Sequence, residues 1–289
     1  MARAETLKLV RESKLAALLP DAPSGVEHEA SGVLVKERQF FVVFDNHTSV
    51  AKLSEDLIPC VMNGLFGMAP VDGGYEGITY NSVKNRYYLL VESRRHKGGR
   101  FRAEIFEYDD GLSYLKSRPV EFDFKSGNKG FEAVCHIRRD NRDYLLALCE
   151  GNKCQSGGKG RKPGGGRIQL FEKRKKRWAH VDTIKLPKSV LFEDFSGMTI
   201  DGNRVAVVSQ QNSMLWIGTF EESKWNWCDG GEAYPFPRTT TGKIAYGNVE
   251  GVAWINLNRL VAVSDRRKKN QPSRFAEKDQ SVHIFDLPE

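Results

Sequence analysis

Five short apolar runs along the chain each begin with an acidic or hydroxyl side chain followed by a small residue. The runs are ASGVLV at 30–35, YEGITY at 75–80, FEAVCH at 131–136, FSGMTI at 195–200 and VEGVAW at 249–254. Their polar residues are Ser31, Glu76, Glu132, Ser196 and Glu250. Carboxylate and hydroxyl oxygens are hard ligands, and Ca²⁺ accepts about six to eight of them. If the five runs meet in space, they predict a site for a hard cation.

Ca²⁺ is the preferred occupant of such a site, because Mg²⁺ demands a stricter octahedron. No His or Cys stands at the five positions, which argues against zinc. The alternative is structural: each glutamate would cap backbone amides of a neighbouring strand, and the glycine would permit a close approach. Three converging carboxylates repel one another unless a cation or shared protons intervene, so convergence favours the metal site.

The intervals between the five polar residues predict a repeat architecture. The intervals run from 45 to 64 residues, and two further β-branched or aromatic runs follow each start. This pattern predicts an all-β fold, a five-bladed β-propeller in one domain. The expected blades span residues 30–70, 75–125, 130–187, 194–235 and 248–289. The last blade has only three strands of its own, so residues 5–12 are expected to supply the fourth and close the ring.

In a propeller the first strand of each blade lines the central channel and the second runs antiparallel to it. The start of strand one and the end of strand two therefore lie on the same face. The expected strand-two ends are Asp45, Glu92, Glu150, Gln210 or Gln211, and Asp265. Together with the five starts, these residues are expected to place ten polar groups around one axis.

Three long basic loops are expected on that same face, at residues 93–100, 151–167 and 265–278. None matches a phosphate-binding loop motif. Arg94, Arg95, Arg266 and Arg267 could hold an anion beside a metal, as guanidinium groups do with phosphoryl oxygens. The glycine-rich loop at 151–167 is expected either to be mobile enough to close over a ligand or to be disordered.

Histidines and tryptophans near the channel add one weak candidate for catalysis. His47 follows Asp45 closely, and a His–Asp pair could activate water, although a single His in a turn is more often only a turn residue. His136 sits inside a strand and is expected in the core. Four tryptophans are expected to pack between blades: Trp216, Trp225, Trp227 and Trp254.

The order Ser, Glu, Glu, Ser, Glu down five blades resembles the calcium-activated nucleotidase (apyrase) family. The resemblance implies a five-bladed propeller that holds one Ca²⁺ through Ser31, Glu76, Glu132, Ser196 and Glu250. It also implies that Asp45 is an essential acid. The chain departs from the family directly after Asp45, where NHT replaces a second acid and an arginine. The runs EGITY and EGVAW equally resemble the SdiA-regulated and esterase-like phytase propellers, and EGVAW resembles the gluconolactonase type.

The composition indicates the class of partner. The 289-residue chain has a formal net charge of +7, which favours anionic partners. No apolar stretch approaches the roughly 20 residues that cross a bilayer, and the first residues have no apolar signal region. A cytoplasmic monomer without a membrane partner is expected. Five irregularly spaced cysteines are expected to be free thiols: Cys60, Cys135, Cys149, Cys154 and Cys228.

The predicted function is a metal-dependent hydrolase of a phosphorylated or other anionic small molecule, with Asp45 orienting or deprotonating the water. One alternative is a non-catalytic propeller, in which the metal pins the ring and the basic face binds an anionic partner. Nucleic acid is such a partner, but the basic loops lack the interleaved aromatics of single-strand binders. The other alternative is a lactonase or esterase that uses the same metal. Propellers host many functions, so the sequence leaves the substrate open.

Overall fold

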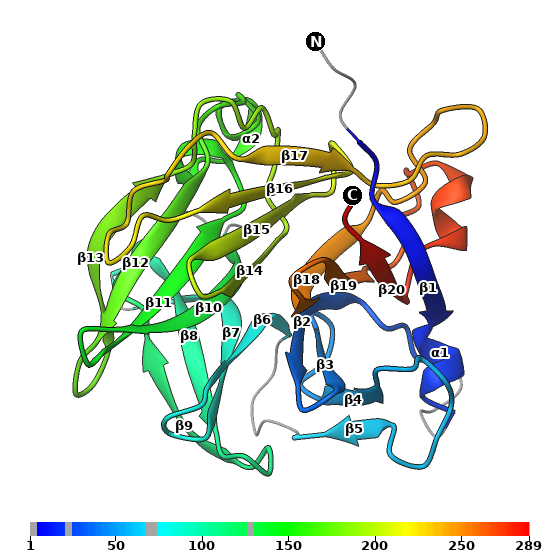
Figure 1. The fold of residues 1–289 in the computed structure, drawn as a ribbon. Coiled ribbons are helices and arrows are strands. Elements are labelled where there is room, and N and C mark those ends of the chain that lie inside the picture. Colours follow the sequence, from blue (N-terminus) through cyan, green and yellow to red (C-terminus); the bar gives the residue numbers. More distant parts are fainter. Residues whose placement is uncertain (1–4, 21–24, 68–73, 97, 126–129, 289) are drawn as a thin grey trace.

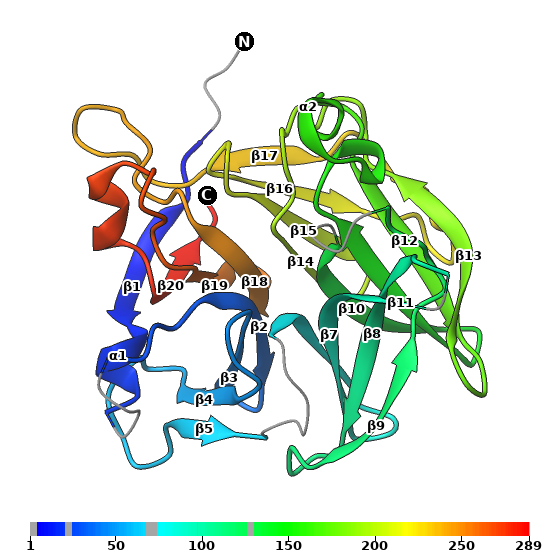
Figure 2. The same cartoon turned by 180° about the vertical axis from the view of Figure 1, so that it is seen from behind.

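The computed structural model describes residues 5–20, 25–67, 74–96, 98–125 and 130–288. Its strands form five four-stranded antiparallel sheets arranged around a central channel (Figures 1 and 2). The predicted five-bladed β-propeller is therefore confirmed. Among the described residues, no helix is long and apolar enough to cross a membrane.

The first three blades follow the chain in order. Blade 1 contains β2 (Ala30–Lys36), β3 (Gln39–Phe44), β4 (Val50–Ser54) and β5 (Gly64–Phe66). Blade 2 contains β6 (Tyr75–Asn81), β7 (Arg86–Arg95), β8 (Phe101–Tyr108) and β9 (Tyr114–Pro119). Blade 3 contains β10 (Phe131–Arg139), β11 (Arg142–Cys149), β12 (Arg167–Lys173) and β13 (Trp178–Lys185).

The last two blades complete the ring. Blade 4 contains β14 (Gly197–Asp201), β15 (Arg204–Ser209), β16 (Met214–Thr219) and β17 (Glu232–Pro235). Blade 5 contains β18 (Val249–Asn256), β19 (Arg259–Ser264), β20 (Ser281–Asp286) and β1 (Lys8–Lys14). The short helical segments are α1 (Leu15–Leu18), η1 (Asn152–Cys154), α2 (Gly157–Gly160) and η2 (Ser273–Glu277). The inner strands contact one another in the closed order β2, β6, β10, β14, β18 and back to β2.

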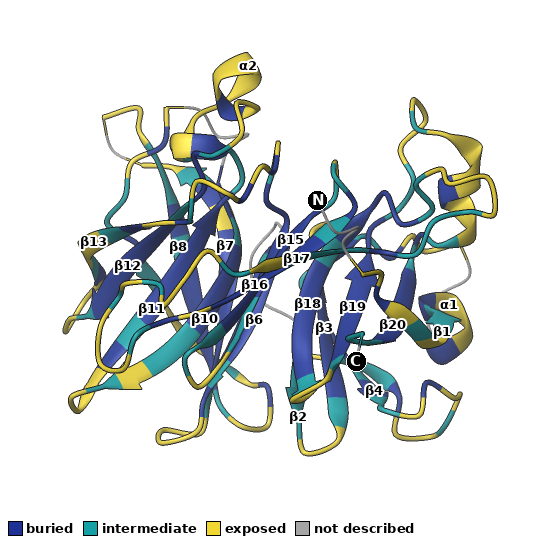
Figure 3. Cartoon of the chain, turned by 45° about the horizontal axis from the view of Figure 1, so that its top comes forward, coloured by how far each residue is buried: buried dark blue, intermediate teal, exposed yellow. Residues whose placement is uncertain are grey.

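Five apolar clusters hold the blades together, one between each pair of neighbouring sheets. Between blades 5 and 1, for example, Val261 and Val263 pack with Phe40 and Phe44. Equivalent clusters fill the other four gaps. Figure 3 shows the inner strands as mostly buried, whereas the turns at both ends are exposed. Full burial of such a side chain is worth about 1.5–3 kcal/mol, so the inter-blade clusters contribute much of the stability of the ring.

The N-terminal strand closes the ring, as the sequence predicted. β1 pairs antiparallel with β20, with Lys8 opposite Asp286 and Lys14 opposite Ser281. A buried polar network strengthens this closure. Nδ1 of His283 lies 3.0 Å from a Glu12 carboxylate oxygen, and Nε2 lies 3.0 Å from the Ser264 hydroxyl oxygen. Lys278 donates a hydrogen bond of 2.5 Å to the other oxygen of Glu12.

Glu12→Gln is expected to weaken this closure in a pH-dependent manner. The hydrogen bond with His283, together with Lys278, lowers the pKa of Glu12 from 4.5 to about 2. A lowered carboxyl pKa stabilises the fold above pH 4.5, and this contribution is lost as the pH falls towards 2. After allowance for solvent screening, the substitution is expected to cost about 2 kcal/mol at pH 7.

Urea unfolding of the two proteins at pH 7, 5 and 3 tests the expectation, with Glu5→Gln as the control because Glu5 is exposed and precedes β1. The stability difference between wild type and Glu12→Gln should shrink as the pH falls. A difference that stays constant from pH 7 to pH 3 would contradict the role of the ionised carboxylate.

Candidate functional site

The channel-lining polar residues lie at β-bulges, which the sequence did not reveal. The register of the first strand shifts between Ala30 and Gly32, Tyr75 and Gly77, Phe131 and Ala133, and Val249 and Gly251. The residue inside each shift is therefore Ser31, Glu76, Glu132 or Glu250. A bulge leaves the extra residue out of the ladder and redirects its side chain. Ser196 directly precedes β14, and its amide donates to the Val208 carbonyl at 3.0 Å.

The small residue after each polar residue allows the five inner strands to approach closely. A Cβ atom on Gly32 would lie 2.9 Å from Cα of Gly77, and one on Gly251 would lie 2.8 Å from Cα of Gly32. A Cβ atom on Gly197 would lie 2.4 Å from the carbonyl oxygen of Glu250. The repeated polar–small pair thus has two separate causes: the small residue closes the ring, and the polar residue lines it.

Four of the five predicted ligands meet at a narrow neck in the channel, and the fifth, Ser196, directly precedes Gly197, which also lines it. Residues from all five inner strands line it, including Ser31, Glu76, Glu132 and Glu250. Its volume of about 10 Å³ is room for about one water-sized sphere. Both serine hydroxyls donate to a backbone carbonyl of the next blade, Ser31 to Tyr75 and Ser196 to Val249. Each serine oxygen can therefore still accept or ligate.

Glu76 and Glu250 both have a raised pKa, because each carboxyl group is buried near other acids. Burial and the repulsion of Glu250 and Glu92 raise the pKa of Glu76 well above its usual range. Burial and the repulsion of Asp265 and Glu132 do the same for the pKa of Glu250. Within the described residues, neither carboxyl group receives a hydrogen bond. Carboxylates in this situation are stabilised by a proton or by a cation.

The ends of the second strands lie beside the starts of the first, as predicted. The amides of Asp45, Glu150 and Asp265 donate to carbonyls two residues before the bulge positions, at Glu29, Gly130 and Asn248. Burial, a hydrogen bond with Glu29 and repulsion by neighbouring acids raise the pKa of Asp45 to about 7. Burial likewise raises the pKa of Asp265 to about 6.

Lys268 is a cation that faces these acids. Burial lowers its pKa, but the carboxylates of Glu250, Asp265 and Asp45 outweigh this effect, so the pKa is raised. Arg266 instead pairs with Glu27 and lies 2.7 Å from a Glu29 carboxylate oxygen. The Arg266 guanidinium group therefore lies against the carboxylate of Glu29. In the sequence, Lys268 is one of several basic residues of the loop at 265–278, and no local pattern marks it as the one that faces the acids.

The other predicted catalytic residues are His47, Arg94 and Arg95. His47 stacks on Phe44 with ring centroids 4.1 Å apart, and burial lowers its pKa to about 4. No hydrogen bond joins it to Asp45 within the described residues. The guanidinium group of Arg94 lies over the Phe106 ring, and Arg95 is exposed at the end of β7. Lys97, in the same basic loop, lies outside the described residues.

The aromatic and histidine residues expected in the core fall in two groups. Trp216, Trp254 and His136 are buried or have buried side chains. Trp225 and Trp227 are only partly buried and pack against the cluster between blades 3 and 4.

The basic loop at 151–167 is folded around one buried side chain, Asn152. Its amide nitrogen donates to the carbonyls of Gly160 and Phe192 at 2.9 and 3.0 Å, and its oxygen accepts from the Gly165 amide at 2.9 Å. Of the two expectations for this loop, disorder therefore does not hold for the described chain. Sequence reasoning missed Asn152 because its partners are remote backbone groups.

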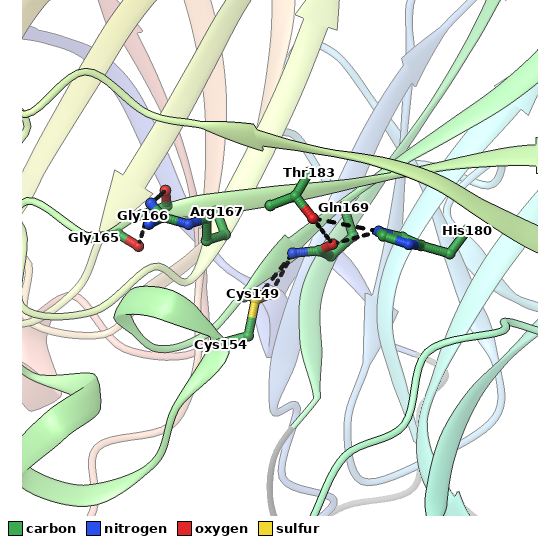
Figure 4. The surroundings of a disulfide bond; sticks show 8 residues. All are labelled: Cys149, Cys154, Gly165, Gly166, Arg167, Gln169, His180 and Thr183. Carbon is green, nitrogen blue, oxygen red and sulfur yellow. Dashed lines mark hydrogen bonds between the residues drawn. A yellow bond between two sulfur atoms is a disulfide. The ribbon is translucent and has the colours of Figure 1, made fainter.

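Cys149 at the end of β11 and Cys154 in this loop form a disulfide, so the prediction of five free thiols is wrong for this pair. Cys149 and Cys154 are joined with their Cα atoms 5.2 Å apart, because the chain turns back sharply with positive φ at Lys153 and Cys154. Figure 4 shows the amide of Gln169 directed at the two sulfur atoms. Disulfides persist in oxidising compartments, so the pair does not favour the predicted cytoplasmic location, which stays a prediction.

A second basic loop, at 265–278, forms the opposite wall of a cavity. Its organiser is the buried Asn248, whose amide donates to the Arg266 carbonyl at 2.8 Å and to the Gln271 side chain at 2.9 Å. Both α2 and η2 lie at the same end of the propeller (Figure 1). Each wall is therefore fixed by a buried asparagine that the sequence reading did not identify.

Between these walls lies a polar cavity of about 760 Å³. It lies on the side of blades 3, 4 and 5, next to the acid cluster, which consists of Asp45, Glu76, Glu250 and Asp265. Glu150, Asp194 and Lys268 line it, together with side-chain amides from three loops. Burial raises the pKa of Asp194 to about 6, against the hydrogen bond that Ser209 donates to it. A cavity of this volume is large enough for a small-molecule ligand.

Some features of the neck favour a bound cation, and one opposes it. In favour, the predicted donors that line the neck are all oxygen atoms, they come from four of the five blades, and the space suits one small sphere. Against it, within the part of the chain that the structure describes, no group of three His, Cys, Asp or Glu side chains is arranged to hold a metal ion. The donor chemistry fits Ca²⁺, and direct coordination would require the carboxylates to move inward.

Comparison with known proteins supports the architecture alone. No family model matches the chain, and no curated protein matches it. Among solved structures, a glutaminyl cyclase from Myxococcus xanthus is similar over 98% of each chain, with 11% identity and a TM-score of 0.57.

Two further similar structures are of enzymes with different activities. The GH43_1 enzyme from Xanthomonas citri is similar over 94% of this chain and 89% of that chain, with 8% identity and a TM-score of 0.54. A PQQ-bound aldose sugar dehydrogenase from Streptomyces coelicolor is similar over 96% and 98%, with 11% identity and a TM-score of 0.51. At these identities the likeness shows that the chain has a β-propeller fold. None of the three is an apyrase, so that resemblance stays a hypothesis.

Proposed function

We propose that the protein is a hydrolase of a phosphorylated or other anionic small molecule, and that it acts at the mouth of the central channel with a divalent cation. The observation that carries this proposal is the pair Glu76 and Glu250. Both carboxyl groups are buried and have raised pKa values, Glu250 is among the acids that raise the pKa of Glu76, and neither group receives a hydrogen bond within the described residues. Several of the similar structures are enzymes by name, which is compatible with the proposal but adds no residue-level support.

The neck residues would hold the cation, with Ca²⁺ preferred to Mg²⁺. The ligands would be Ser31, Glu76, Glu132, Ser196 and Glu250. A bound cation supplies Lewis acidity that polarises a phosphoryl oxygen. Asp45 would accept a proton from the attacking water, a role for which a pKa near 7 is suited. Lys268 would hold the anionic group, and Arg266 would position Glu29 beside Asp45.

The reaction joins the oxygen of water to phosphorus and breaks the bond from phosphorus to the leaving oxygen. The proton taken by Asp45 is delivered to the leaving oxygen or to bulk water. Glu29 supports this role, because its carboxyl group shares a hydrogen bond with Asp45. If the metal binds but no ester is cleaved, the non-catalytic propeller with a basic face becomes the better description.

Ca²⁺ is expected to raise the melting temperature of the wild-type protein relative to EDTA. At 100 times the dissociation constant, binding stabilises the fold by about 2.7 kcal/mol. Glu76→Gln is expected to abolish this shift and to raise the melting temperature in EDTA. The second effect follows because a raised folded-state pKa means that the ionised carboxyl destabilises the fold.

Glu222→Gln serves as the control, since Glu222 is exposed and lines a separate cavity beside Arg138 and Arg139. Turnover is then measured on p-nitrophenyl phosphate, nucleoside diphosphates and p-nitrophenyl acetate, with and without Ca²⁺. No melting shift with Ca²⁺ or Mg²⁺ would remove the cation from the proposal. Cleavage of the acetate alone would favour the esterase alternative.

A further inference from the structure

The cavity beside the neck is lined mostly by polar side chains. The buried Asn152, behind the first wall of the cavity, is satisfied by backbone partners. Several polar side chains that line the cavity form no hydrogen bond or ion pair within the described residues, and most of them are exposed, so a ligand would replace water at them. These are Gln155, Arg161, Gln210, Gln211 and Asn270.

The cavity is also a built structure, because glycines allow its wall to close. A Cβ atom on Gly151 or Gly160 would lie 2.1 Å from the carbonyl oxygen of Gln155. On the opposite wall, a Cβ atom on Gly247 would lie 2.1 Å from the Phe275 ring. The disulfide between Cys149 and Cys154 fixes the start of the first wall. The unpaired amides are therefore held by an ordered frame.

The cavity lining carries charges of both signs: the acids Glu150, Glu193 and Asp194, and the basic residues Lys268 and Arg161. Lys268 interacts electrostatically with Glu250 and Asp45, so it marks the end beside the neck. Arg161 follows α2 on the wall contributed by blade 3. The same cavity is lined by the amides of Gln210, Gln211 and Asn270. Side-chain amides both donate and accept, which is what a series of hydroxyl groups requires.

We propose that this cavity is the recognition site for a phosphorylated, hydroxyl-rich ligand such as a sugar phosphate. The phosphoryl group lies beside Lys268, next to the neck, and the hydroxyl groups of the ligand face Gln210, Gln211 and Asn270. Arg161 supplies a second positive charge for a ligand with a further anionic group. This assignment rests on the proposed hydrolase function for the direction of the phosphoryl group, but the binding itself needs no catalysis.

Isothermal titration with three probes tests the assignment without turnover: ribose 5-phosphate, ribose and inorganic phosphate. Ribose 5-phosphate is expected to bind at least tenfold more tightly than either of the other two. Lys268→Gln is expected to weaken ribose 5-phosphate and inorganic phosphate by about tenfold, the usual effect of losing one charge-assisted contact. Lys269→Gln is the matched control, because Lys269 is the exposed neighbour and does not line the cavity.

Gln210→Ala separates the two parts of the ligand. It is expected to weaken ribose 5-phosphate while leaving inorganic phosphate unchanged. Equal affinity for ribose 5-phosphate and inorganic phosphate, or equal effects of Lys268→Gln and Lys269→Gln, would overturn the assignment. Binding with the expected pattern but without hydrolysis would retain this site and reject the proposed function. Hydrolysis with kinetic constants that Gln210→Ala leaves unchanged would retain the proposed function and reject this site.

Discussion

Asp45→Asn is expected to lower the turnover number of the proposed hydrolysis by about 10²- to 10⁴-fold, the usual contribution of a general base. The amide keeps the shape of the side chain but cannot accept a proton from water. The position of the residue should not change, because the backbone amide of Asp45 is held by the Glu29 carbonyl at 2.9 Å. The Michaelis constant should change little, since Lys268 and the cavity amides carry substrate binding.

Steady-state kinetics on the best ester of the panel measure this effect, and the Ca²⁺-induced melting shift is recorded for the same variant. Asp201→Asn is the control, because Asp201 is an exposed acid at the far end of β14. Retained Ca²⁺ binding with lost turnover supports the role of a base. Loss of both would identify Asp45 as a metal ligand instead, and full turnover would remove it from the mechanism.

The sequence predicted the ring because one short pattern has a strong geometric cause. A polar residue followed by a small one recurs wherever an inner strand meets its neighbour, and closing five strands requires that repetition. Gly32 and Gly251 show the steric part of this cause, and Glu76 shows the polar part. The closing strand was predictable as well, since a blade with three strands leaves an open edge.

The walls of the cavity were not predictable in the same way. Asn152 and Asn248 bond to backbone groups brought near by loops, and no local pattern announces such partners. The Cys149–Cys154 pair was missed because spacing alone does not reveal the sharp turn between the two residues. Arg266 and Lys268 look equivalent in a basic run, yet the fold turns one towards Glu27 and Glu29 and the other towards the acid cluster.

Gly197→Ala is expected to lower the free energy of unfolding by about 1–3 kcal/mol, the usual effect of overpacking a tight contact. The added Cβ would lie 2.4 Å from the carbonyl oxygen of Glu250 and 3.3 Å from Cα of Gly251. Both are backbone atoms of the neighbouring inner strand, so no side-chain rotation can relieve the clash. The strand must shift, and the Glu250 carboxyl group must shift with it.

Gly158→Ala is the matched control, because a Cβ atom there meets nothing within 4 Å and Gly158 has no positive φ. Both substitutions restrict the unfolded chain equally, so the difference between their urea midpoints reports the clash alone. Gly197→Ala should also reduce the Ca²⁺-induced melting shift, whereas Gly158→Ala should not. If Gly197→Ala is as stable as Gly158→Ala, the inner strands can separate at little cost. The close approach that brings the five polar residues to one neck would then not be a requirement of the fold, and the proposed cation site would lose its geometric basis.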